Sequence, residues 1–370
     1  MLLVAGALLS GASGPRALPR PTAHKTRGGD PAQKSTFAAQ IAALSEPAGY
    51  FDTDNLISNE RSYLQILPDL ERANVLGGVY IGVGPDQNFS YIAAIRPALA
   101  FIVDIRRDNL LLHLLFKAIF SISRTRVEYL ALLLGRPVPS SLDGWRGETI
   151  QKLVFYAMTP PDRAAVDGLR TRVDDVIRKM GVPLSRDDFA TIDRYHRRFI
   201  EGGVHLQFQS FGRPPQRDYP RYAELLAETD SAGRHRNYLA SEEAFQFVKS
   251  MQAQDTIIPV VGDLGGPSAL VSIGRLLDVR REKLSALYAS NVEDYLFRDG
   301  RFPRFVQNLG RIPHSDNSVV IRSIFWRGMS GARPGDNSTS KIQPVDELLN
   351  AFAKGRIQGY GDLLVSSSAR

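Results

Sequence analysis

Small and acidic residues recur where apolar runs end, which is where a parallel sheet places its ligand-binding edge. The run "GGVYIGV" leads into "GPDQN", and together they supply Gly82, Gly84, Asp86 and Asn88. Glycine lets the backbone approach a ligand without a side chain in the way. The amides at the start of a following helix favour an anionic group or a carboxylate. These four residues are therefore candidates for ligand binding.

Two further apolar runs end in an aspartate. "ALAFIVDI" carries Asp104 with Arg106 close behind, and "TIIPVVGD" ends in Gly262 and Asp263. A carboxylate after the second strand is placed to accept hydrogen bonds from ribose hydroxyls, and Asp263 could accept from an exocyclic amine in the same way. The spacing predicts a nucleoside-containing ligand. The alternative is that each aspartate only caps or turns the chain before a helix.

A fourth apolar run, "LSALYASN", ends in Ser290 and Asn291. Ser290 joins the ligand-binding candidates, and Asn291 could orient a substrate amine or hydroxyl. Glu293 and Glu60 are the candidates for a general base. The alternative is that Asn291 caps the next helix with Glu293 in its first turn, and for Glu293 we favour that interpretation. Glu60 has a similar capping alternative.

Several chemistries are excluded or disfavoured. The chain of 370 residues has no cysteine, which excludes disulfides, thiolate nucleophiles and cysteine-bound metals. No Walker-type phosphate loop and no G-x-S-x-G nucleophile turn occur. Gln87 stands where a dinucleotide fingerprint needs its third glycine. The six histidines do not cluster, so we expect no metal site.

The apolar runs alternate with helical patterns, which predicts an α/β protein with a doubly wound, mostly parallel sheet. This rhythm breaks over residues 123–240, which we expect to be a large helical insertion between strands two and three. The α/β domain then has a first part at 35–122 and a second at 241–370, where "GDLLV" is a candidate last strand. Residues 1–34 are expected to be a disordered leader or a signal segment.

The order of these strand-end features resembles that of the class I S-adenosylmethionine-dependent methyltransferases. The resemblance implies their Rossmann-like fold and S-adenosylmethionine as cofactor, with Gly82 and Gly84 in the first loop. It also implies that Asp104 holds the ribose and that Asp263 meets the adenine. The chain departs from the pattern at Tyr80, where an acid is usual two residues before the first loop glycine, and at Asp86, which replaces the third glycine.

The motifs "FDTDNLISNE", "GVYIGVGPDQNFSYI", "AFIVDIRRDN", "VVGDLGGP" and "YASNVEDYLF" also resemble, as a set, an uncharacterised bacterial family with that fold. The resemblance covers most of the chain from about Ala48 to Phe325. It implies the fold more strongly than an activity.

We expect methyl transfer to a small-molecule or other unknown acceptor. One alternative is a non-catalytic nucleoside- or ligand-binding protein on the same fold. Another is a nucleic-acid-modifying enzyme that uses the arginines of the insertion, since the formal net charge is +7 and "RYHRRF" is basic. No apolar run is long enough for a membrane span. We expect a cytoplasmic protein, or an exported one if the N-terminal apolar segment is a signal peptide. The sequence does not indicate an oligomeric state.

Overall fold

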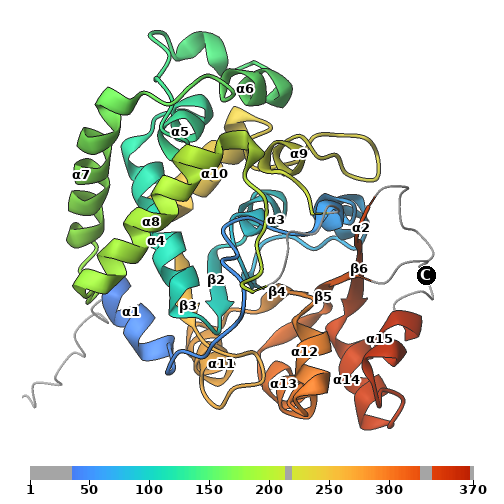
Figure 1. Cartoon of the computed structure of the whole chain (residues 1–370). Coiled ribbons are helices and arrows are strands. Elements are labelled where there is room, and N and C mark those ends of the chain that lie inside the picture. The colour runs from blue at the N-terminus through green and yellow to red at the C-terminus, as the bar shows by residue number, and fades with distance from the viewer. Residues whose placement is uncertain (1–35, 213–218, 326–335, 367–370) are drawn as a thin grey trace, which may run out of the picture. The chain divides into compact units, whose positions relative to one another are not determined.

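The computed structural model describes residues 36–212, 219–325 and 336–366, so the expected leader at 1–34 lies outside the described residues. A six-stranded sheet with the order β3-β2-β1-β4-β5-β6 runs through this part of the chain (Figure 1). Its strands are β1 (Val79–Gly82), β2 (Leu99–Asp104), β3 (Ile257–Val261), β4 (Leu284–Ser290), β5 (His314–Ile324) and β6 (Thr339–Pro344). Strands β1 to β5 are parallel to their neighbours, and β6 pairs antiparallel with β5. The expected α/β class with a mostly parallel sheet is confirmed.

One expected element is wrong. The segment "GDLLV" lies in the helix α15 (Tyr360–Ser366), whereas the last strand is β6, which the sequence pattern did not reveal. The letters of β6, "TSKIQP", are mostly polar. An edge strand needs only one neighbour and can carry such residues, so it lacks the apolar run by which central strands are found.

The strand order reverses between β1 and β4, which makes this the point where a crevice opens in a doubly wound sheet. Right-handed crossovers on the two sides of this point place their helices on opposite faces. The helices α3 (Gln87–Ile95) and α4 (Arg107–Ile122) cover one face, and α11 (Ala269–Arg280), α12 (Val292–Arg298) and α13 (Phe302–Leu309) lie on the other (Figure 1). Burial on both faces explains why β1, β2 and β3 are apolar up to their carboxyl ends.

Helices fill the described part of the chain between β2 and β3. They are α4, α5 (Arg126–Leu133), α6 (Ile150–Tyr156), α7 (Arg163–Lys179), α8 (Arg186–Gly202), α9 (Tyr222–Leu226) and α10 (Glu242–Ala253). The helix α4 is buried along nearly its whole length because the sheet lies on one side of it and α5, α7, α8 and α10 pack around the other. This position explains the run "LLLHLLFKAIF" in α4.

The N-terminal helix α1 (Phe37–Leu44) packs against β3 and α11. The segment that follows it, residues 45–60, is here called the strap. It crosses the carboxyl ends of two strands, where Glu46 N donates to Val261 O at 2.9 Å and Gly49 N donates to Ile105 O at 2.8 Å. The strap leads through a short 3-10 helix, η1 (Arg61–Leu64), and α2 (Leu67–Arg72) into β1.

The C-terminal part of the described chain adds α14 (Val345–Ala353) and α15 to the side of the sheet that holds α12 and α13 (Figure 1). Across the described residues, no helix combines the length and the apolar character that a bilayer crossing requires.

Candidate functional site

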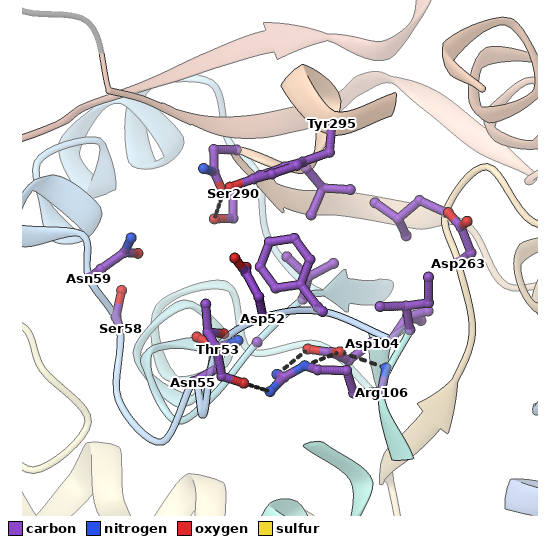
Figure 2. A pocket seen from close by; sticks show the side chains of 18 of the residues that line it. Asp52, Thr53, Asn55, Ser58, Asn59, Asp104, Arg106, Asp263, Ser290 and Tyr295 are labelled. Atoms are coloured by element: carbon purple, nitrogen blue, oxygen red, sulfur yellow. Dashed lines mark hydrogen bonds and ion pairs between the residues drawn. The ribbon is translucent and has the colours of Figure 1, made fainter. Parts of the chain in front are cut away.

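A cavity of about 230 Å³ lies at the carboxyl edge of the sheet (Figure 2). Its walls are the strap, the loop after β1, the ends of β2, β3 and β4, and the start of α12, with Phe208, Ser210 and Tyr219 closing one side. The strand-order reversal between β1 and β4 lies within this wall, where a doubly wound sheet binds its ligands. The cavity is therefore the candidate site.

Glu60 lies in the cavity wall and is 1 % exposed. Three hydroxyls donate to its carboxylate: those of Tyr288 and Ser290 on β4, and that of Ser323 on β5 at 2.5 Å. Burial raises the pKa of the Glu60 carboxyl above its usual range, and the three hydroxyl donors oppose that rise. A carboxyl that is both buried and hydrogen-bonded in a cavity is suited to accept a proton.

Gln87 presents an unpartnered acceptor beside this carboxyl. Its Nε2 donates to the hydroxyl of Tyr288 at 3.3 Å, while its Oε1 is buried without a hydrogen-bond partner. The Tyr288 hydroxyl gives its one proton to Glu60, so Gln87 must turn its amide nitrogen toward Tyr288. Gln87 lines the cavity and is 6 % exposed, and its Oε1 needs a donor that the described residues do not supply.

The loop after β1 is held in one conformation by contacts at Gly84 and at Gly82. Gly84 has φ +83°, a conformation that favours glycine, and its carbonyl lies 2.9 Å from Nε2 of the buried His113 on α4. Burial lowers the pKa of His113 to about 4, so the ring is neutral and donates to that carbonyl. Gly82 has no room for a side chain, because a Cβ there would lie 2.6 Å from the hydroxyl of Tyr80. The loop is thus preorganised at the cavity wall.

Asn88 and Tyr80 hold this loop and do not line the cavity. The Nδ2 of Asn88 donates to Val83 O at 2.9 Å and to Pro85 O at 2.7 Å, and its Oδ1 accepts from the Tyr80 hydroxyl at 2.8 Å. Tyr80, at the position where the resembled family has an acid, is thus a buried support of the loop. Asn88, a candidate for ligand binding, acts on the cavity only through the backbone it holds.

Asp86 also faces away from the cavity. Its carboxylate accepts from the hydroxyls of Tyr222 at 2.8 Å and Tyr238 at 3.2 Å, both from the chain between β2 and β3. It stands at the N-cap position of α3 without a side-chain capping bond. A direct contact of Asp86 with a ligand in the cavity is therefore not expected.

Asp104 and Arg106 both line the cavity and form an ion pair (Figure 2). Arg106 Nε and Nη2 donate to the two carboxylate oxygens of Asp104 at 3.1 and 3.0 Å, and Nη1 donates to Thr53 O in the strap at 2.9 Å. Burial acts to lower the pKa of Arg106, but the neighbouring Asp104 carboxylate raises it above its usual value. A ribose at Asp104 would have to share this carboxylate with Arg106.

Asp263 lines the cavity at the end of β3, and one of its oxygens pairs with Arg301. Its other oxygen accepts from Gly265 N at 2.8 Å. Gly262, also in the wall, is needed for close packing of strand and helix, because a Cβ there would collide with Cβ of Ala269 in α11.

Ser290 and Asn291 complete the wall at the end of β4. Ser290 has φ +53°, an uncommon conformation for a residue with a side chain. Its hydroxyl donates to Glu60 and lies 3.3 Å from Oδ1 of Asn291. Asn291 makes no capping bond at the start of α12. The capping bond considered as the alternative role of Asn291 is therefore not formed, and Asn291 lines the cavity.

Glu293 is not part of the cavity wall. Both of its carboxylate oxygens bind the guanidinium of Arg322 on β5, at 2.6 and 3.1 Å, and both side chains are fully buried. Arg322 Nη1 also donates to Oε1 of Gln343 on β6 at 2.8 Å. Glu293 joins α12 to the sheet, so a role as general base in the cavity is not supported by its position.

Residues with uncommon backbone conformations also lie in the cavity wall. Six described residues other than glycine have positive φ, and four of them, Asn74, Arg96, Asp255 and Arg281, lie at helix ends where the left-handed conformation is usual. The other two, Asn55 and Ser290, line the cavity. Strained backbone that is held in place at a cavity is typical of functional sites.

The cavity has an excess of negative charge. Five carboxyl groups line it, those of Asp52, Glu60, Asp104, Asp263 and Asp299, against the two guanidinium groups of Arg106 and Arg301. The whole chain has a formal net charge of +7. The cavity therefore differs in sign from the protein as a whole and favours a cationic ligand. No cluster of His, Asp or Glu in the described ranges is arranged to hold a metal ion.

Sequence patterns did not reveal Gln87 as an acceptor, nor Tyr288, Ser323 and Arg301. Tyr288 and Ser323 lie within strands and look like ordinary inward-facing residues. Arg301 follows the glycine after α12 and gives no motif. Their roles arise from proximity in space, and the only local signal was Gln87 in place of a loop glycine.

Several arginines on which the nucleic-acid alternative depends form ion pairs within the described residues. Arg198 lies 3.4 Å from Asp54, and Arg234 bonds to Asp230 and Glu71 at 2.9 and 3.0 Å. Arg213 and Arg217, two further arginines of the expected helical insertion, lie outside the described ranges.

The chain matches a protein family described as a domain of unknown function (DUF7790) over residues 55–136 and 206–356. These two segments make up more than half of the chain, so the protein belongs to this family. The match includes the loop after β1 and the ends of β2, β3 and β4, but excludes α1, most of the strap, and residues 137–205 within the helical region. No curated protein matches the chain.

Proposed function

We propose that the protein binds S-adenosylmethionine in the cavity and transfers its methyl group to a small-molecule acceptor, on a fold of the class I methyltransferase type. The observation that carries the proposal is the negative cavity at the strand-order reversal. A phosphate-bearing ligand would be repelled there, whereas a sulfonium and an ammonium group would be attracted. A strand order that reverses beside β1, with an antiparallel strand at the edge, is compatible with that fold.

The residues present fit such a cofactor. The Oε1 of Gln87 is a buried acceptor without a partner on a residue of the cavity wall, and a protonated amino group would supply the donor it needs. Gly84 allows close approach of the backbone. Asp104 would receive the ribose hydroxyls on the lone pairs that Arg106 leaves, and Asp263 would accept from the exocyclic amine of the base.

When bound, the cofactor supplies a methyl group activated by the positive sulfur. The chain then has to position the acceptor and remove its proton, and positioning alone accounts for much of the acceleration in such transfers. Asn291 can hold the acceptor by its amide. Glu60, with its pKa raised by burial, can take the proton.

A second function, non-catalytic ligand binding on the same fold, is favoured by one observation. Both oxygens of Asp104 are already bonded to Arg106, which is how a protein would stabilise this edge without a ribose. The two functions differ in turnover: both include binding, but only the enzyme produces S-adenosylhomocysteine when an acceptor is added.

Calorimetry tests the binding step. We expect the full chain to bind S-adenosylmethionine, and Gln87→Met to weaken that binding about tenfold, because a hydrogen bond to a charged group is lost. The matched control is Gln307→Met, which changes an exposed glutamine outside the cavity on α13. A folded wild type that binds neither S-adenosylmethionine nor S-adenosylhomocysteine would overturn the proposal. So would equal affinities of the Gln87→Met and Gln307→Met proteins.

A further inference from the structure

Aromatic side chains surround the outer part of the cavity. Phe51 of the strap meets Tyr295 of α12 edge-to-face with ring centroids 4.9 Å apart, and Phe208 meets Tyr219 in the same way at 5.0 Å. All four line the cavity together with Tyr50, which is 78 % exposed. A ring so exposed contributes little to the core, but it offers a face to an incoming flat ligand.

Polar groups on the strap accompany these rings. Asp52 follows Tyr50 and Phe51 in the chain and projects among the lining side chains (Figure 2). Thr53 lines the cavity and is 5 % exposed. Its Oγ1 is buried and has no hydrogen-bond partner. The outer cavity thus combines aromatic faces, a carboxylate and an unused hydroxyl, which together suit an aromatic ligand with a positive amine.

We propose that the acceptor is a small molecule with a flat aromatic ring and a basic amine, bound against these rings with its nitrogen directed toward Glu60. This inference rests on the proposed function and names its substrate class. The bound ammonium first passes a proton to the Glu60 carboxylate. Its neutral nitrogen then forms a bond to the methyl carbon as the carbon–sulfur bond breaks, and the electron pair of that bond stays on sulfur.

The strap supplies much of the chemistry that selects the acceptor. Tyr50, Phe51, Asp52 and Thr53 all lie before residue 55, where the family match begins. The loop after β1 and the strand ends, which would hold the cofactor, lie inside the match. The acceptor side of the cavity therefore belongs in part to a segment that the family match does not include.

Three probes separate ring from charge: tryptamine is aromatic and cationic, tryptophol is its neutral alcohol, and 2-cyclohexylethylamine is cationic without an aromatic ring. Calorimetry with the full chain, alone and saturated with S-adenosylhomocysteine, measures binding of each. We expect tryptamine to bind at least about fivefold more tightly than either other probe. Equal or tighter binding of tryptophol or of 2-cyclohexylethylamine would overturn the inference.

Substitutions in the cavity wall test whether tryptamine binds there. Tyr50→Ala should weaken tryptamine binding about threefold or more, whereas Phe155→Ala, which removes a 74 %-exposed ring on α6 outside the cavity, should not. Asp52→Asn should weaken tryptamine but leave tryptophol unchanged, with Asp143→Asn, at an exposed side chain in another part of the chain, as control. Equal effects of the cavity and control variants would contradict the site.

The outcomes separate the two proposals. Binding of S-adenosylhomocysteine without binding of tryptamine would leave the methyltransferase proposal standing and overturn the acceptor class. Binding of tryptamine at Tyr50 and Asp52 without binding of either cofactor form would overturn the methyltransferase proposal, and with it the role of this ligand as a methyl acceptor.

Discussion

Asp86 lies two residues after the loop glycine Gly84, yet its carboxylate is directed into a cluster of tyrosines. Burial raises its pKa to about 6, and the hydroxyls of Tyr222 and Tyr238 oppose that rise. In this short loop, Gly84 therefore lines the cavity, whereas Asp86 packs among buried tyrosines outside the cavity wall. Such a buried acid makes folding sensitive to pH, whatever the cavity binds.

We expect Asp86 to make unfolding depend on pH in a defined window. Its pKa is higher in the folded than in the unfolded chain, so its stabilising contribution is full below about pH 4 and is lost as the pH rises to about 6. A difference of about two pKa units corresponds to about 3 kcal/mol. Denaturant unfolding at pH 4.5 and 7 should therefore show a smaller loss of stability for Asp86→Asn than for the wild type.

The Asp86 prediction concerns how the free energy of unfolding changes with pH, and not its absolute value. The absolute value also changes in Asp86→Asn, because the asparagine NH2 is a donor that faces tyrosine hydroxyls which themselves donate. Asp316→Asn, at an exposed residue of β5, is the control. Parallel pH profiles for wild type and Asp86→Asn would contradict the prediction.

At the scale of elements, the carboxylate of one residue adds four hydrogen bonds between the strap and the sheet edge. Glu46 accepts from Asp263 N at 2.8 Å, from Ser268 N and Oγ at 3.0 and 2.8 Å, and from Ala269 N at 3.1 Å. It thereby occupies the amides at the start of α11, where another fold of this kind could bind a phosphate. Glu46 of the strap thus occupies a position where an anion could bind, and other residues of the strap form a wall of the cavity.

We expect Glu46→Ala to lower the free energy of unfolding by about 2 kcal/mol, since four donors lose their acceptor and the start of α11 loses its cap. The loss should extend to ligand affinity, because the strap also positions Asp52 and Thr53. Chemical denaturation and calorimetry measure the two effects. Glu282→Ala, at a partly exposed residue just after α11, is the control. An unchanged midpoint for Glu46→Ala would show that the strap is held by its other contacts.

At the scale of the whole molecule, charge is distributed unevenly. The chain has a formal net charge of +7, but five carboxyl groups against two guanidinium groups line the cavity. Positive surface charge gives weak, salt-sensitive binding of polyanions. A polyanion would nevertheless be repelled from the cavity itself, so its binding and that of the small ligand should be independent.

A fluorescent single-stranded oligonucleotide tests this separation. We expect binding at about 20 mM salt that is lost by about 200 mM, and no change in the affinity for S-adenosylmethionine when the oligonucleotide is present. Fluorescence anisotropy and calorimetry measure the two. Mutual displacement of oligonucleotide and S-adenosylmethionine at low salt would favour the nucleic-acid-modifying alternative.

The sequence by itself determined the α/β class, the central strands and the helices between them. It could do so because buried strands and amphipathic helices leave periodic patterns in neighbouring residues. It also placed Gly84, Asp104, Asp263 and Asn291 at one edge, since the carboxyl ends of parallel strands meet there.

Only the tertiary structure decided where each side chain points. Asp104 ends β2, and Asp86 and Glu293 follow β1 and β4 within a few residues, yet Asp86 faces tyrosines and Glu293 faces Arg322. The Glu60 site needs hydroxyls from β4 and β5, more than 200 residues further along the chain. Contacts between residues so far apart leave no local pattern, because they are set by packing and not by neighbours in the sequence.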